Sequence, residues 1–90
     1  MNKERRKTLQ EARDLLDKAE GLISEAMQLL ENAKDEEQEA FDALSEGLQQ
    51  ADRGQVMEAA ISALDDAINE ADTAVTSCQN AAGNIETAQE

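Results

Sequence analysis

The chain has 90 residues, 40% of them hydrophobic but only one aromatic, Phe41, so any core must be small and built from aliphatic side chains. Eight Lys and Arg residues against 21 Asp and Glu give a formal net charge of −13, and the sequence holds no His and one Cys. This composition argues against acid–base catalysis, a zinc site and an internal disulfide, so we expect a non-enzymatic protein that uses no metal and no cofactor.

The first element expected is a long helix over residues 3–44, because Pro is absent and good helix formers dominate. Its apolar residues recur every seven positions. One row holds Leu9, Leu16, Ile23 and Leu30, a second Ala12, Ala19, Ala26, Ala33 and Ala40, and a third Leu15, Leu22 and Leu29. Glu37 continues the first row with a charge, so the pattern allows a break near 35–37, with residues 36–50 as a short cap helix.

A turn is expected over 45–54, where Gly47 and Gly54 flank polar residues, with Asp52 or Gly54 as the cap of a second long helix over 55–88. That helix repeats the seven-residue pattern. Its rows are Met57, Leu64, Ala71, Cys78 and Ile85, then Ala60, Ala67, Ala74, Ala81 and Ala88, then Ile61, Ile68 and Val75.

The predicted fold class is all-α, with residues 1–90 as one domain. The two alanine rows predict a close antiparallel helical hairpin, although helices of these lengths would leave one overhanging the other. A parallel long coiled coil is the competing arrangement. The third rows would stay partly exposed in a lone hairpin, so we expect a homodimer that forms a four-helix bundle.

Charge is unevenly placed along the chain. The first 18 residues carry a net +2 and the remainder −15, with no cation after Arg53. Glu58, Asp65, Asp72 and Glu86 share one heptad position, interrupted only by Gln79, and six acids fall between residues 35 and 46. Carboxylates on a stiff helical scaffold can occupy a basic groove that holds phosphates.

This pattern predicts a protein that inhibits or modulates a nucleic-acid-handling host or defence protein by mimicking nucleic acid. The predicted partner-binding residues are Asp35, Glu36, Glu37, Glu39, Asp42, Asp65, Asp66, Glu70 and Asp72. Two alternatives stay open: the acids only keep the protein soluble, or the chain is a structural or assembly protein that associates through its apolar helix faces. Direct nucleic-acid binding and calcium binding are not expected, because of the charge and the missing loop spacing.

No apolar run approaches the ~20 residues of a membrane span, and the charged start MNKERRKTLQEAR is unlike a signal peptide. We therefore expect a cytoplasmic protein without a membrane partner.

The run DEEQEAFDALSEGLQQADRGQVMEAAISALDDAINE, residues 35–70, resembles a group of small acidic helical proteins encoded by bacteriophages and prophages. The likeness rests on the acid-rich block, the EAFD segment, a Leu followed by a turn, the RG pair and the amphipathic helix that follows. The group often has Pro after that Leu, where this chain has Ser45. The resemblance implies a phage origin and, with it, action on host enzymes or defence systems in the host cytoplasm.

Overall fold

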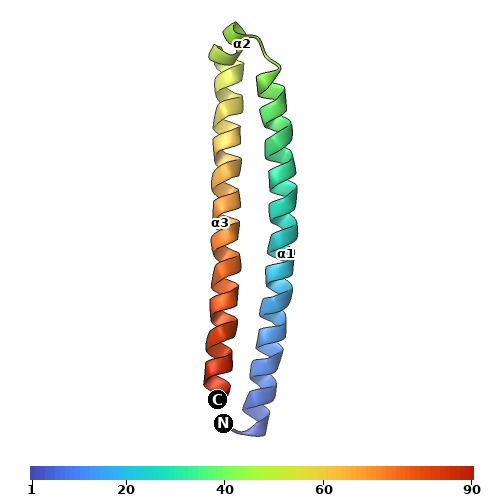
Figure 1. The fold of residues 1–90 in the computed structure, drawn as a ribbon, viewed down its shortest axis with the longest axis vertical. Coiled ribbons are helices and arrows are strands. Elements are labelled where there is room, and N and C mark those ends of the chain that lie inside the picture. The colour runs from blue at the N-terminus through green and yellow to red at the C-terminus, as the bar shows by residue number, and fades with distance from the viewer.

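The computed structural model describes all 90 residues and contains three helices: α1 (Lys3–Asp42), α2 (Glu46–Gln50) and α3 (Asp52–Gln89). The prediction of an all-helical chain is confirmed. In Figure 1, α1 and α3 run side by side in opposite directions, α2 sits at the connected end, and both termini lie at the other end. The Cα atoms extend over 68 × 15 × 14 Å, so the molecule is a thin rod.

The helix ends follow from local hydrogen bonds. Asn2 caps α1, because its side chain accepts a hydrogen bond from the backbone N–H of Arg5 at 2.8 Å. Ser45 caps α2 in the same way through the N–H of Leu48. Neither expected cap of the second long helix is used: α3 starts at Asp52 after Ala51, which makes no side-chain cap hydrogen bond.

α1 is continuous through residues 35–37, so the break that Glu37 allowed does not occur. A short helix does lie at the turn, but it is α2, which covers residues 46–50 of the predicted turn and does not begin at residue 36. Glu37 is only half-buried, and on so thin a rod its carboxylate can stay hydrated while the backbone keeps its helical hydrogen bonds. The expected mismatch of lengths also disappears, because α3 begins at residue 52 rather than 55. The two long helices contain 40 and 38 residues.

The expected alanine contact holds along most of α3 and in only part of α1. On α3, Ala60, Ala67, Ala74 and Ala81 are half-buried. On α1, Ala12 and Ala19 are half-buried, whereas Ala26, Ala33 and Ala40 are exposed. Along its whole length α1 turns two other rows toward α3. Their half-buried residues are Leu9, Leu16, Ile23, Leu30 and Glu37, together with Arg13, Glu20, Met27, Lys34 and Phe41.

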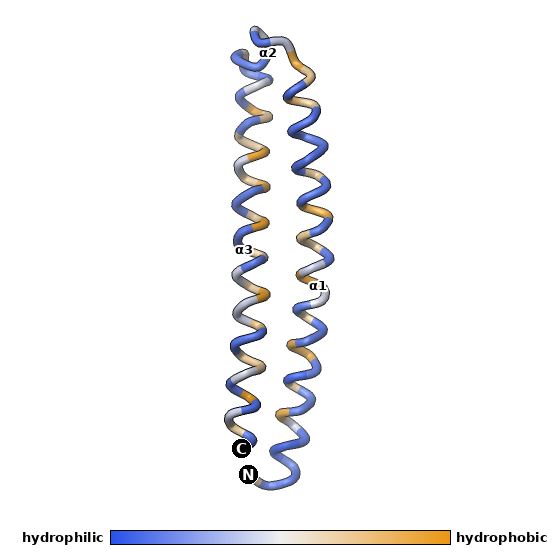
Figure 2. The backbone as a smooth tube through the Cα atoms, viewed as in Figure 1, coloured by the Kyte–Doolittle hydropathy of each residue, from blue (hydrophilic) through white to orange (hydrophobic).

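The rotation of α1 has a physical cause. Arg13 and Lys34 can pair with carboxylates of α3 only on this side, and Met27 and Phe41 offer more apolar area than alanine. Figure 2 shows hydrophobic segments recurring along the side of α3 that faces α1.

α2 connects the long helices through a close backbone contact at Gly54. A Cβ atom at this position would collide with the carbonyl group of Gln49, so only glycine fits. The Gln49 side chain in turn donates hydrogen bonds to the carbonyl oxygens of Phe41 and Leu44, at 3.2 and 3.3 Å. These contacts hold the end of α1, α2 and the first turn of α3 together.

Gly54 is the one fully buried residue, and no hydrophobic side chain is fully buried. Two helices alone can cover each other on one side only, so every core residue keeps part of its surface in water. No helix combines the length and apolar character that crossing a membrane requires.

Candidate interaction surfaces

One flank of the rod carries polar pairs between the two long helices. Arg13 forms an ion pair with Glu86 at 2.6 Å, and Lys34 forms one with Asp65 at 2.8 Å. Between them, the Gln79 side chain donates a hydrogen bond to Glu20 at 2.9 Å. We call these three contacts the polar row.

The three pairs of the polar row obey a single rule. In each, the two residue numbers sum to 99, as they must when antiparallel heptads lie in one constant register. The interruption of the acidic heptad position at Gln79 is thereby explained: an acid there would face Glu20 across the helix pair, whereas the amide can donate to it.

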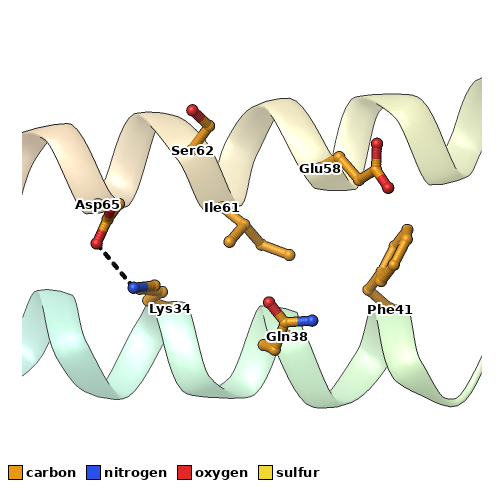
Figure 3. Close-up of a pocket in the computed structure, with 7 residues that line it drawn as sticks. All are labelled: Lys34, Gln38, Phe41, Glu58, Ile61, Ser62 and Asp65. Carbon is orange, nitrogen blue, oxygen red and sulfur yellow. Dashed lines mark hydrogen bonds and ion pairs between the residues drawn. The ribbon is translucent and has the colours of Figure 1, made fainter.

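The polar row changes the role of part of the predicted acidic surface. Asp65, a predicted partner-binding residue, is the hydrogen-bonded partner of Lys34 (Figure 3). This hydrogen bond, together with nearby carboxylates, raises the pKa of Lys34 above its ordinary value of 10.5. Asp65 therefore contributes to holding the helices in register.

The other predicted partner-binding residues do not gather on one face. All of them except the half-buried Glu37 are exposed, but the run from Asp35 to Glu39 turns through more than one full circle of α1. Asp66 and Glu70 lie together on an exposed hollow of α3, lined also by Asn69 and Thr73. The fold thus distributes the predicted acids around the rod.

What the fold does concentrate is net charge along the rod axis. We call residues 19–79, which are 61 of the 90 residues, the turn half, and the other 29, residues 1–18 and 80–90, the terminal half. The turn half holds 15 of the 21 acidic residues and only two basic ones, Lys34 and Arg53, so its net charge is −13. The terminal half holds six acids and six basic residues, and its net charge is zero.

The two halves are spatial units because the chain folds back on itself. The basic start of α1 lies beside the end of α3, whose only acids past Gln79 are Glu86 and Glu90 (Figure 1). The contrast of +2 and −15 along the chain therefore becomes a contrast between a neutral and an acidic end of the rod.

A groove between α1 and α3 lies near the turn (Figure 3). It has a volume of about 350 Å³ and is lined by Lys34, Gln38, Phe41, Glu58, Ile61, Ser62 and Asp65. Its one cation, Lys34, is bound to Asp65. No group of three or more His, Cys, Asp or Glu residues in the structure could hold a metal ion.

Opposite the polar row, the rod carries exposed leucines. Leu15, Leu22 and Leu29 of α1 expose 66%, 60% and 69% of their surface. The other flank expected to remain uncovered, that of Ile61, Ile68 and Val75, is half-buried. It lies on the side of α3 that α1 covers.

Sequence reasoning missed Glu20, Lys34 and Gln79 as contact residues. The signal was present in the heptad pattern. Each residue at the acidic heptad position of α3 can be paired with the α1 residue whose number brings the sum to 99. This pairing gives two pairs of opposite charge and places the acid Glu20 opposite Gln79.

No protein-family model, curated protein or solved structure matches this chain.

Proposed function

We propose that the protein is a non-enzymatic, dimeric helical rod that binds a host protein with a basic nucleic-acid groove and inhibits or modulates it by occupying that groove. The observation that carries the proposal is the concentration of the entire net charge of −13 in the turn half. A phage origin and a host-cytoplasmic site of action belong to the same proposal.

The linear density of this charge supports mimicry. Residues 19–42 of α1 rise by about 36 Å at ~1.5 Å per residue, so 13 net charges correspond to one per about 2.8 Å of rod. A single nucleic-acid strand carries one charge per ~3.4 Å and duplex DNA one per ~1.7 Å. The turn half lies between the two, and it is rigid where a solubilising tail would be flexible.

The distribution of acids around the rod shapes the proposal further. No single face carries the charge, so a partner that encloses the rod in a groove would contact more of it than a flat partner. The surface acids Glu36, Glu39, Asp66 and Glu70 form no hydrogen bond or ion pair through their side chains, which leaves them free for such contacts.

The test compares two variants of equal net charge. The first, E36Q/E39Q/D66N/E70Q, neutralises four exposed acids of the turn half. The matched control, E4Q/E11Q/D14N/D17N, neutralises four exposed acids of the terminal half. Both variants carry −9, so a difference between them reports the position of the charge and excludes its total amount as the cause.

Tagged wild-type protein and both variants would be used to capture proteins from a bacterial lysate, and the captured partner would be eluted with duplex DNA or with salt. We expect DNA to elute the partner, the turn-half variant to lose at least tenfold in affinity and the terminal-half variant to keep its affinity. Equal binding by all three proteins, or equal loss by both variants, would contradict the proposal.

A second candidate function is favoured by the exposed leucines. In this alternative the protein is a structural or assembly component that associates through its apolar helix faces. Capture that survives high salt and ignores duplex DNA, together with retained binding by the turn-half variant, would support it.

A further inference from the structure

The leucine flank and one alanine row lie on the same face of the rod. On α1, each exposed leucine lies two residues after a member of the half-buried row opposite the acids: Leu15 follows Arg13 and Leu22 follows Glu20. Two residues rotate about 200° around a helix, so these leucines point to the flank opposite the polar row.

The same step applies on α3. Ala67 lies two residues after Asp65, and Ala81 lies two residues after Gln79, so the alanine row also points away from the polar row. Because the polar row joins the helices on one flank, the leucines and the alanines share the other. The residue numbers of the pairs Leu15 and Ala81, Leu22 and Ala74, and Leu29 and Ala67 each sum to 96, so the offset along the rod is the same in all three pairs.

This face, which we call the leucine–alanine face, has a raised and a low side. Three large side chains stand along α1, and beside them lie Ala26 and Ala33 of α1 and the alanine row of α3. A ridge beside a shallow strip of small residues is self-complementary under a two-fold axis, since each ridge can lie on the strip of the other copy.

The exposed area of the chain is more than a monomer of its mass normally shows. At 9.8 kDa a folded monomer exposes about 5,200 Å². This rod exposes 6494 Å², an excess of about 1,300 Å² over that expectation. A standard interface covers about 800 Å² on each partner, so a second copy on this face would account for most of the excess.

We propose that a second copy of this chain docks on the leucine–alanine face, with Leu15, Leu22 and Leu29 of each copy packed on the alanine row of α3 in the other. The occupant is a second copy rather than an unrelated protein because ridge and strip occur together on one face. Docking there gives the hydrophobic residues the covered core that two helices cannot supply. This inference rests on the dimeric state in the proposed function and names the surface that forms the dimer. The acids of the outer helix faces stay exposed in such a dimer, so binding to a basic groove can be tested separately.

The test is the molar mass in solution, measured by sedimentation equilibrium or light scattering because a rod migrates anomalously in gel filtration. Wild-type protein at 10–100 μM is expected to show twice 9.8 kDa. The L22E variant is expected to show 9.8 kDa. The control S24E adds the same charge two residues away on the opposite flank and is expected to remain a dimer.

The milder variant L22A protects the test against loss of folding. Alanine favours helix, and Leu22 is 60% exposed in a single copy, so helicity by circular dichroism should match that of wild type while the dimer dissociation constant rises at least tenfold. A wild-type monomer at all concentrations would overturn the proposal and leave the face to a different partner. A dimer that L22E and L22A leave unchanged would place the interface elsewhere.

The dimer test and the capture test fail separately. Capture that the turn-half variant retains, with an intact dimer, would contradict the proposed groove binding alone. A monomeric wild type that still captures its partner would contradict the dimer and its interface alone.

Discussion

The two ends of the rod are built from the same heptads but differ in how they are stabilised. The terminal half is neutral and contains the ion pair Arg13–Glu86, and the Glu20–Gln79 hydrogen bond lies where the two halves meet. The turn half carries −13, contains one ion pair, Lys34–Asp65, and is closed by the tight contact at Gly54. The comparison teaches that the two ends are stabilised differently. The acidic end is held together mainly by backbone packing at Gly54, whereas in the neutral end balanced charges can attract one another.

The largest expected effect compares one glycine in each half. The variant G54A should destabilise the protein by about 2 kcal/mol, because its Cβ would collide with the backbone of Gln49. The variant G83A, in the terminal half, has nothing within 4 Å of its Cβ and should stabilise α3 by about 0.5–1 kcal/mol. Thermal unfolding followed by circular dichroism measures both. Equal effects of the two substitutions would remove the distinction drawn between the halves.

The next effect is that of salt. Raising the salt concentration from low to moderate should stabilise the turn half by about 1 kcal/mol, because several like-charge repulsions of a few tenths each are screened. The balanced terminal half should gain little. Amide hydrogen exchange at both salt concentrations resolves the two halves residue by residue. A uniform response along the rod would show that the acids do not repel one another appreciably.

A smaller effect tests the polar row itself. The variant Q79E would place two carboxylates opposite each other at Glu20 and should destabilise the protein by about 0.5 kcal/mol at low salt. The double variant E20Q/Q79E exchanges the two groups and should regain most of that loss. A double-mutant cycle by denaturant unfolding gives the coupling. An additive outcome would mean that the two side chains do not interact in solution.

The smallest expected effect is a loss of stability at alkaline pH. Because the pKa of Lys34 is raised when the chain folds, its favourable contribution is complete below pH 10.5 and is lost as the pH rises through the higher folded-state pKa. Wild type should therefore be slightly more stable than D65N at pH 8, and the difference should shrink by pH 11.5. Melting temperatures at the two pH values provide the comparison. A constant difference would mean that the ion pair does not stabilise the fold.

The helices were predictable because their signals are local. Absence of Pro, high helix propensity and seven-residue repeats such as Leu9, Leu16 and Ile23 are visible without knowledge of any neighbour. The region where the chain reverses was predictable from Gly47 and Gly54, but the helix α2 within it and the role of Gly54 were not. That role depends on the path of α2, which places Gln49 against it.

The face that α1 turns to α3 was not predictable from its own pattern. α1 offers an alanine row on one side of its leucines and a mixed row containing Arg13, Met27 and Phe41 on the other. The acids of α3 decide between them, so the choice requires both helices to be considered together. The predicted partner-binding acids are exposed apart from Glu37, but their spread around the rod could be seen only once α1 was known to be continuous.

The constant sum of 99 has a consequence for the length of the molecule. Because every interhelical contact of the polar row repeats with the heptad, removing or adding seven residues in α1 and the matching seven in α3 leaves all remaining partners opposite one another. Each such exchange changes the height of the rod by about 10.5 Å. Chains of this architecture can therefore differ by whole heptads in both long helices while keeping their caps and their turn. The length of the rod would then change in steps of one heptad.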